Sequence, residues 1–325
     1  MSARPRPRGG LRLLADVGGT NARFATQRPG AAPANLRVVA DDAFPTLEAA
    51  AEAYLAGLGA GARPRTAAFA VASPVLGDRV AMTNRAWSFS IEALRQALGL
   101  DTLRVVNDIE AVALALPALG PADCVPIGQG TATAGAPVGV LAPGTGLGTA
   151  ALVWHEGVPL ALASEGGHVT MAAADDDEAA VLAWLRRHLG HVSAERVLSG
   201  QGLINLHRAL AALRGAADEA DLTPDELGRR AVAGTHPPAR ATVELFSAML
   251  GGFAGNLALT LGALGGVYIA GGIVPKLGAA FDEVRFRARF EDKGRFQPYL
   301  ARIPTWLVTH ETPALLGLAA LLDRN

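Results

Sequence analysis

Short apolar runs alternate with segments of helical periodicity along most of the chain. Apolar runs at 11–15 and 22–26 flank a polar turn, and further runs stand at 66–72, 103–106 and 137–141. Between them, apolar residues recur at intervals of three and four, the spacing that places side chains on one face of a helix. This alternation of strands and helices predicts an α/β protein.

Two of the predicted helices have clear boundary signals. Ser90 precedes a helical pattern over 91–98, where its hydroxyl can accept a hydrogen bond from a free backbone N–H. Pro117 ends a second pattern over 109–116, because proline lacks the N–H that a helix interior needs. A third pattern, over 313–322, lies near the carboxyl terminus, and we expect it to pack on the N-terminal part of the chain.

One uncharged segment, 245–275, is long enough to cross a bilayer. Asn256, Thr260 and a Gly-Gly pair interrupt it, however. The pattern therefore favours a buried helix over about 240–264 followed by a strand at 267–270, and we expect no membrane association.

The composition sets further limits. With 325 residues, 50% of them hydrophobic and 18% charged, the chain exceeds one typical domain, so two lobes with sizeable cores are expected. The formal net charge of −1 disfavours nucleic acid as the main partner, since phosphate backbones attract basic surfaces. Cys124 is the only cysteine, which excludes an internal disulfide and a cysteine-rich zinc site and fits a reducing cytoplasm.

The domain organisation follows from these patterns. We expect a flexible tail over 1–10, a small N-terminal lobe over 11–118 completed by 311–325, and a large C-terminal lobe over 119–310. The tail is rich in Arg and Pro, and the apolar run after it is too short for a signal peptide.

The turn between the first two apolar runs carries candidate chemistry. Asp16 ends the first strand and is followed by Gly18, Gly19, Thr20 and Asn21. Glycine tolerates positive φ and lets a ligand approach the backbone, while N–H groups and a Thr hydroxyl suit phosphate oxygens. A carboxylate beside them can attract Mg²⁺ or its water ligands. Taken alone, the turn slightly favours an ordinary hairpin; a Walker loop or a dinucleotide fingerprint fits worse, because each must lead into a helix.

A second glycine-rich turn repeats this arrangement. The strand at 137–141 leads to Gly144, Thr145 and Gly146, and a returning strand follows at 149–154. The repetition suggests a duplicated architecture with one such hairpin in each lobe.

Gly271 and Gly272 follow the predicted strand at 267–270 and enter a helix. Their small size leaves room for a flat ring such as adenine. In isolation, a tight strand-to-helix turn is the better interpretation.

Asn107 and Asp108 stand where a predicted strand ends and a helix begins, the edge at which open α/β sheets bind ligands. Asp108 has two interpretations of equal weight. It can be a helix N-cap, or the helix dipole can keep it ionised to accept a proton from a hydroxyl that attacks phosphorus.

Glu165 and His168 are separated only by glycines after a predicted strand at 158–163. Such a loop can direct two polar groups at a sugar, whose hydroxyls both donate and accept, although a local turn is as good an interpretation. Glu195 is predicted in the first turn of a helix capped by Ser193, where interaction with the helix dipole is the default explanation.

A metal site is a weaker alternative for this region, because the chain lacks a His-Glu-x-x-His pattern. Its candidate ligands are His155, Glu156, Glu165, His168, His188 and His191.

Taken together, these motifs resemble those of the bacterial glucokinases, members of the actin-like sugar-kinase superfamily. The resemblance extends from about Leu13 to Leu321. Segments 16–23 and 144–148 resemble the two phosphate motifs of the family, and segment 269–275 resembles its adenosine motif. Segments 81–84, 191–200 and 290–296 also match.

The resemblance implies a two-lobed actin-like ATPase fold, related to ribonuclease H. Each lobe would hold a mixed sheet with flanking helices, and the ligand cleft would lie between the lobes. The implied activity is transfer of the ATP γ-phosphoryl group to the glucose 6-hydroxyl at the entry to glycolysis. The implied partners are glucose and ATP, with Mg²⁺ as cofactor, in a cytoplasmic homodimer.

The resemblance also implies roles for single residues. Asp108 would be the catalytic base, and Asp16 would hold Mg²⁺ through water. The implied glucose-binding residues are Asn107, Asp108, Glu165, His168 and Glu195. The implied ATP-binding residues are Asp16, Gly18, Gly19, Thr20, Asn21, Thr145, Gly146, Gly271 and Gly272.

Three alternatives stay open at this point. The chain can be a kinase for another hexose, such as mannose, fructose or an N-acetylamino sugar. It can also be a non-catalytic sensor of sugar or nucleotide, or an actin-like or chaperone ATPase that needs no sugar.

Overall fold

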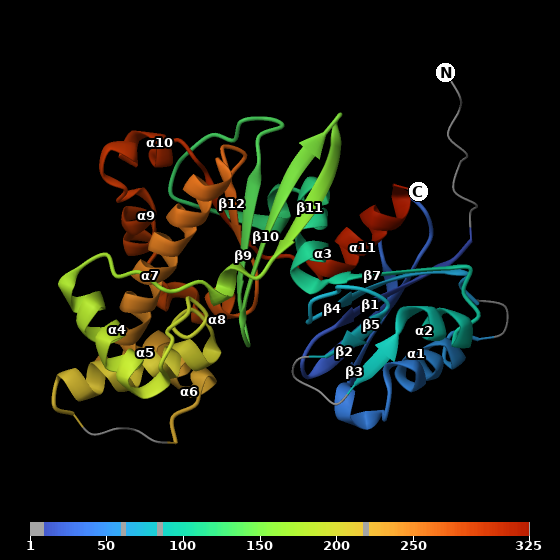
Figure 1. The fold of residues 1–325 in the computed structure, drawn as a ribbon, viewed down its shortest axis with the longest axis horizontal. Coiled ribbons are helices and arrows are strands. Elements are labelled where there is room, and N and C mark those ends of the chain that lie inside the picture. Colours follow the sequence, from blue (N-terminus) through green and yellow to red (C-terminus); the bar gives the residue numbers. More distant parts are fainter. Residues whose placement is uncertain (1–9, 60–62, 83–86, 217–220, 325) are drawn as a thin grey trace. The chain divides into compact units, whose positions relative to one another are not determined.

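The computed structural model describes residues 10–59, 63–82, 87–216 and 221–324. The predicted tail therefore lies almost wholly outside the described residues, as do Thr83 and Asn84. The chain forms two compact units (Figure 1). Unit 1 comprises Met1–Leu119 and His310–Asn325, and unit 2 comprises Gly120–Thr309.

Unit 1 contains a five-stranded mixed sheet with the strand order β3-β2-β1-β4-β7. The strands are β1 (Arg12–Val17), β2 (Asn21–Gln27), β3 (Ala34–Ala40), β4 (Thr66–Val71) and β7 (Thr102–Asn107). β1 pairs antiparallel with β2, which confirms the predicted hairpin, and parallel with β4, which in turn pairs parallel with β7. β5 (Arg79–Ala81) and β6 (Ser88–Ser90) form a separate two-stranded sheet.

Helices cover both faces of this sheet. They are α1 (Leu47–Ala56), α2 (Ile91–Ala97), α3 (Asp108–Ala115) and α11 (Pro313–Asp323), with 3-10 turns η1 (Asp41–Ala43) and η2 (Leu116–Ala118). Phe24, Phe69 and Tyr54 belong to the core on one face. On the other face, Leu315 and Leu318 of α11 pack against the sheet.

The carboxyl-terminal helix α11 packs on α3, β4 and β1, as predicted. Gly317 permits this approach, because a Cβ at that position would overlap the carbonyl oxygen of Ala111. The Arg12 guanidinium in β1 also donates to Asp323 Oδ1 over 2.5 Å and to the carbonyl oxygen of Leu322 over 3.2 Å. The last residues of the chain are therefore part of the N-terminal fold.

Unit 2 contains a six-stranded mixed sheet with the order β11-β10-β9-β12-β13-β8. The strands are β8 (Cys124–Ile127), β9 (Val138–Pro143), β10 (Leu147–His155), β11 (Val158–Ser164), β12 (Val267–Ile269) and β13 (Thr305–Val308). The helices are α4 (Asp176–Leu189), α5 (Gly200–Leu213), α6 (Pro224–Ala233), α7 (Pro237–Leu261), α8 (Ile273–Leu277), α9 (Glu283–Glu291) and α10 (Gln297–Ala301). The 3-10 turns are η3 (Pro121–Asp123), η4 (Gly166–His168), η5 (Gly278–Ala280) and η6 (Gly294–Phe296).

The long apolar helix α7 is the central helix of unit 2. It passes a length and hydropathy test for a membrane span, but 67% of the apolar window is buried inside the protein. The helix packs on α9, α5 and α6. A Cβ at Gly251 or Gly255 would overlap the carbonyl oxygens of Phe286 and Phe290 in α9. The two glycines therefore serve the packing of α7 against α9 within unit 2.

The prediction that Ser193 caps a helix containing Glu195 is wrong. Residues 193–199 form a bridge and turns, and helix α5 begins only at Gly200. Its N-cap is Ser199, whose Oγ accepts from Gly202 N over 3.0 Å and donates to the carbonyl oxygen of Glu195 over 2.7 Å. An isolated antiparallel bridge pairs Ser193 with Thr170 instead.

The close contact of α7 with α9 makes a testable prediction. Gly251→Ala forces a Cβ against the carbonyl oxygen of Phe286, and overpacking of this kind costs about 1–3 kcal/mol. Gly252→Ala has no heavy atom within 4 Å of the new Cβ and gains helix propensity, so it stabilises by about 0.5–1 kcal/mol. Urea denaturation of the two variants should move the midpoint in opposite directions. Equal midpoints would contradict the packing role of Gly251.

Candidate functional site

The turn between β1 and β2 begins with a glycine at a tightly packed backbone position. Gly18 N donates to the carbonyl oxygen of Asn21 over 3.0 Å, and a Cβ at Gly18 would lie 3.3 Å from that oxygen. Gly18 does not use the positive φ that glycine tolerates. The constraint at Gly18 is therefore the close approach of the backbone within the turn and not its handedness, and a Cβ there would need the Asn21 carbonyl to shift by a few tenths of an ångström.

Asp16 is a partly buried carboxylate on the strand that enters this turn. Its side chain is 16% exposed, and its Oδ2 accepts from the Arg23 guanidinium over 3.3 Å. Burial raises the pKa of Asp16, and Arg23 opposes part of that rise through its charge and its hydrogen bond. The pairing of β1 with β2 places these two residues directly opposite each other.

Asn107 caps helix α3. Its Oδ1 accepts from Ile109 N over 3.1 Å, and its Nδ2 donates to the carbonyl oxygen of Ser73 over 3.3 Å. Asp108 is therefore the first residue of α3 and not its N-cap, although its Oδ1 also accepts from Ile109 N, over 2.8 Å. The N-cap of α3 is therefore Asn107 and not Asp108.

Asp16 and Asn107 lie at the same edge of the unit 1 sheet. In the parallel register, Val17 pairs with Val71, and Val71 pairs with Asn107. β4 is thus the one strand between them, and adjacent strands are about 4.8 Å apart. The structure therefore brings the first glycine turn and the Asn107–Asp108 pair together within unit 1.

The second turn, between β9 and β10, is held by backbone hydrogen bonds. Gly144 N donates to the carbonyl oxygen of Gly146 over 2.8 Å, and Gly200 N donates to that of Gly144 over 2.9 Å. The first residue of α5 therefore stabilises this turn through a backbone hydrogen bond.

Gly271 and Gly272 lie beside the second turn. β12 pairs parallel with β9, so both strands end at one edge of the unit 2 sheet. Gly271 has a φ of +81°, and a Cβ there would lie 2.5 Å from the carbonyl oxygen of Pro143. Gly272 is the N-cap of α8, and a Cβ on it would have no heavy atom within 4 Å. Gly271 is therefore needed for close packing, whereas Gly272 leaves open space beside the backbone.

Glu195 comes together with Glu165 and His168, although it lies on a separate segment of the chain. His168 Nε2 is 3.8 Å from Glu165 Oε2, and His168 Nδ1 is 3.9 Å from Glu195 Oε1. The side chains of Glu165 and His168 are 61% and 60% exposed, and that of Glu195 is 31% exposed. Three polar groups able to bind hydroxyls thus share one surface of unit 2.

The zinc alternative finds no support in the geometry. Among the described residues, no three His, Cys, Asp or Glu side chains are placed to hold a metal ion. His188 is on α4, whereas His191 follows Gly190 beyond the helix and contacts Thr170 Oγ1 over 2.9 Å. The two histidines therefore do not share a helix face.

Two groups of this site have no local signal in the sequence. The contact of Arg23 with Asp16 arises only from the hairpin register, which places the two residues opposite each other. The Leu147 amide, which donates to Glu195 Oε2 over 3.0 Å, has no signal in the sequence.

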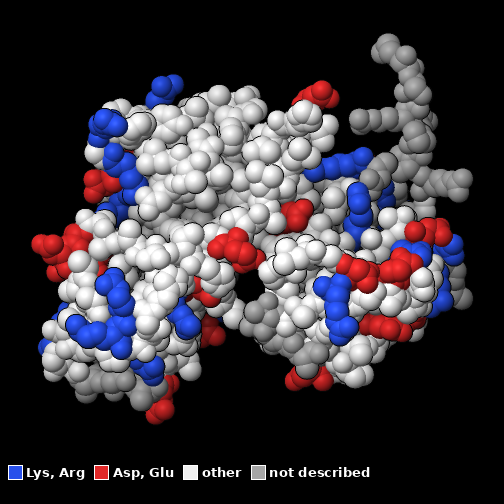
Figure 2. Space-filling model, viewed as in Figure 1, with Lys and Arg blue, Asp and Glu red and all other residues white. Residues whose placement is uncertain are grey.

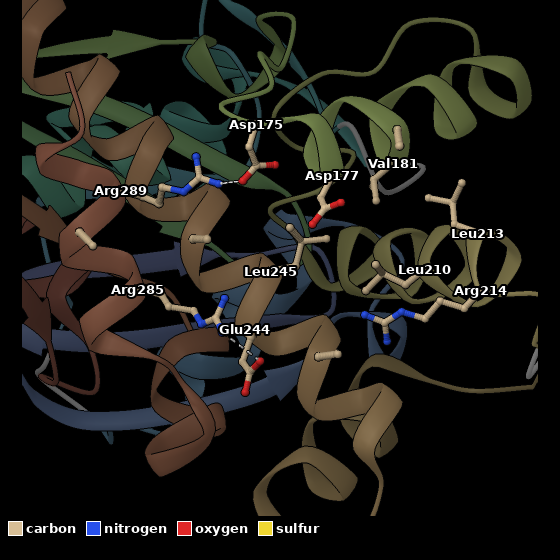
Figure 3. Close-up of a pocket in the computed structure, with 14 residues that line it drawn as sticks. Asp175, Asp177, Val181, Leu210, Leu213, Arg214, Glu244, Leu245, Arg285 and Arg289 are labelled. Carbon is tan, nitrogen blue, oxygen red and sulfur yellow. Dashed lines mark hydrogen bonds and ion pairs between the residues drawn. The ribbon is translucent and has the colours of Figure 1, made fainter. Parts of the chain in front are cut away.

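A cavity of about 580 Å³ lies elsewhere in unit 2, among α4, α5, α7 and α9 (Figure 3). Apolar side chains such as Leu210 and Leu245 line it, and ion pairs join Arg289 to Asp175 and Arg285 to Glu244 at its wall. None of the sequence-predicted site residues lines this cavity. It is therefore separate from the candidate site.

Charged side chains of both signs are interspersed on the face shown in Figure 2. The described residues of that face form no basic stripe of the kind that follows a phosphate backbone.

Comparison with known proteins agrees with this arrangement. Residues 13–325 match the sequence profile of the glucokinase family. The chain is 53% identical over 311 residues to the glucokinase of Paramagnetospirillum magneticum, covering 95% of this chain and 97% of that protein. It is 51% identical to the glucokinase of Chromobacterium violaceum, covering 96% and 89%. The crystal structure of a glucokinase from an Antarctic psychrotroph superposes with a TM-score of 0.88 at 37% identity, covering 98% of this chain and all of that one.

The two mixed sheets with flanking helices and these similarities define an ATP-dependent sugar kinase of the actin-like ATPase fold. The chain belongs to the glucokinase family.

Burial of Asp16 makes a prediction about stability and pH. Because the folded-state pKa of Asp16 is raised, its ionised form is disfavoured in the fold, and this cost is present above that pKa. Asp16→Asn should therefore raise the melting temperature at pH 7, and the advantage should shrink as the pH falls through the raised pKa toward the ordinary pKa of an aspartate. Differential scanning fluorimetry across pH measures this. Asp177→Asn, which changes an exposed carboxylate on α4, is the matched control. A lower melting temperature for Asp16→Asn at pH 7 would contradict the prediction.

Proposed function

We propose that this chain transfers the γ-phosphoryl group of ATP to the 6-hydroxyl of glucose, giving glucose 6-phosphate and ADP at the entry to glycolysis. The observation that carries the proposal is the position of Asp108 at the start of α3, beside the first glycine turn in unit 1. The family membership and the glucokinases that the chain resembles support the same reaction.

Asp108 is the base in this proposal. The positive end of the α3 dipole favours the carboxylate over the protonated acid. The carboxylate accepts the proton of the 6-hydroxyl, the sugar oxygen forms its bond to the γ-phosphorus, and the bond from that phosphorus to the bridging oxygen of ADP breaks. Asn107, fixed by Ser73 and by Ile109, would bind a neighbouring hydroxyl.

Unit 2 supplies the groups that would orient the sugar. Glu165 and Glu195 offer acceptors, and each has a carboxylate oxygen within 4 Å of a ring nitrogen of His168. A pyranose held by several such bonds presents one hydroxyl to the phosphorus, and the fixed orientation accelerates the transfer. Glucose is therefore the acceptor that we assign to these groups.

The glycine turns would bind the nucleotide. Gly18, Gly19, Thr20 and Asn21 in unit 1 would bind phosphate oxygens. Thr145 and Gly146 in unit 2 would do the same, and Gly271 and Gly272 would border the adenine ring.

Mg²⁺ would neutralise charge on the phosphates of ATP. Asp16 fits such an ion through a water molecule better than by direct ligation, because Arg23 already donates to Asp16 Oδ2. A single carboxylate is sufficient, since Mg²⁺ in kinases takes most of its other ligands from phosphates and water.

The proposed assembly is a homodimer in the cytoplasm. The family resemblance and the single cysteine support this assignment. Sedimentation equilibrium on the purified chain measures the assembly state, and a monomer at micromolar concentration would contradict it.

Removal of the base tests the proposed reaction. Asp108→Asn keeps the N-cap, which is Asn107, and so should leave the fold intact while lowering kcat by roughly 10²–10⁴. A coupled assay of glucose 6-phosphate measures kcat, and circular dichroism checks the fold. Asp101→Asn, just before the amino end of the same strand β7, is the control that should retain activity. A folded Asp108→Asn variant with normal turnover would refute the assignment.

Substitutions of the proposed sugar-binding residues should change the KM for glucose, whereas the change at Asp108 acts on kcat. A hydrogen bond to a charged group contributes about 1.5–3 kcal/mol and an ordinary one about 0.5–1.5 kcal/mol, so Glu165→Gln should raise the KM for glucose by roughly 10–100-fold and His168→Asn by roughly 2–10-fold. The KM for ATP should change little. Initial rates over a matrix of glucose and ATP concentrations measure both constants, and the same matrix with mannose, fructose and N-acetylglucosamine tests the sugar assignment. An unchanged KM for glucose in both variants would remove these residues from the sugar site.

A further inference from the structure

The Glu195 side chain connects the second glycine turn with the loop that carries His168. Its Oε2 accepts from Leu147 N, at the end of the turn, over 3.0 Å. Its Oε1 lies 3.9 Å from His168 Nδ1. The Glu195 backbone also donates, through its N–H, to the carbonyl oxygen of Gly167 over 2.9 Å. One residue therefore contacts both segments through both of its carboxylate oxygens.

The two segments are packed against each other without space between them. A Cβ at Gly146 would lie 2.5 Å from Glu195 Oε2, so only glycine leaves the carboxylate where it is. A Cβ at Gly167 would overlap the carbonyl oxygen of Leu147. A change in the conformation of the turn therefore has to move the Glu195 carboxylate or the loop.

The proposed function gives these two segments different ligands. The turn would bind a phosphate of the nucleotide, and the loop would bind hydroxyls of the sugar. One Glu195 oxygen is already held by the turn, so the direction of the other oxygen depends on the conformation of the turn. A nucleotide phosphate that shifts the turn would thereby change the direction of the acceptor that the sugar needs.

We propose that the Glu195 carboxylate, held by the Leu147 amide against Gly146, couples glucose binding to nucleotide binding in this chain. The inference rests on the proposed function, which assigns the two ligands. Each substrate should raise the affinity for the other, and by thermodynamic linkage the factor must be the same in both directions. The residues that carry the coupling lie within unit 2.

Isothermal titration calorimetry on the full chain tests the proposal with glucose and with the non-hydrolysable ATP analogue AMPPNP in the presence of Mg²⁺. Glucose is titrated with and without saturating AMPPNP, and AMPPNP with and without saturating glucose. In the wild-type chain, each ligand should bind about fivefold or more tightly when the other is present.

Two alanine substitutions in the same turn form a matched pair. Gly146→Ala places a Cβ where Glu195 Oε2 lies, displaces the carboxylate from the Leu147 amide and should reduce the coupling factor to about one. Gly144→Ala has no heavy atom within 4 Å of the new Cβ and should keep the wild-type factor. Glu195→Asp is an independent variant that keeps the charge. Its carboxylate is one methylene too short to stay bonded to Leu147 N, so its factor should also fall toward one.

The possible outcomes distinguish failure of the proposed function from failure of the coupling proposal. If neither ligand binds the folded wild-type chain, the proposed function fails. If both bind but their affinities are independent, the proposed function stands and the coupling proposal fails. A coupling factor in both Gly146→Ala and Glu195→Asp equal to that of the wild type would also overturn the proposal, because the contact would then not carry the effect.

Discussion

Parallel strand pairing is the constraint on which the position of the chemistry depends. Parallel strands have their carboxyl ends at one edge of the sheet, and helices that follow them begin at that edge. In unit 1, the register of β1, β4 and β7 brings the turn after Asp16 and the Asn107–Asp108 pair to the same edge. In unit 2, the parallel pair β9 and β12 does the same for the second turn and for Gly271–Gly272. In each unit the candidate groups therefore lie at one edge of the sheet, although they are far apart in the sequence.

Glycine size is a second constraint, and it acts at individual contacts. Gly271 and Gly146 allow the segments around the second turn to approach a carbonyl oxygen and a carboxylate oxygen. Gly251 and Gly317 allow two pairs of helices to approach each other in the two units. The same residue type therefore serves both the site and the cores, so a glycine in this sequence does not by itself indicate a ligand. Only its surroundings distinguish the two uses.

Much of the fold could be predicted from the sequence, because local patterns determine it. The antiparallel hairpin around Gly18, the Ser90 cap of α2 and the buried helix α7 all follow from hydrophobic periodicity and from capping or turn residues. The segment 193–199 could not be predicted in this way. A serine before an acidic residue is a common helix start, but the bridge between Thr170 and Ser193 is a long-range contact that overrides that local preference.

The sequence by itself determined the class of the protein, through the order and spacing of its glycine turns and the Asn107–Asp108 pair. It could not determine which polar groups touch. The tertiary structure decided that Asn107 and not Asp108 caps α3, that Arg23 contacts Asp16, and that Glu195 bonds the amide of Leu147. The physical reason is that hydrogen bonds between distant segments depend on sheet register and on packing at single glycines, and neither leaves a local signal in the chain.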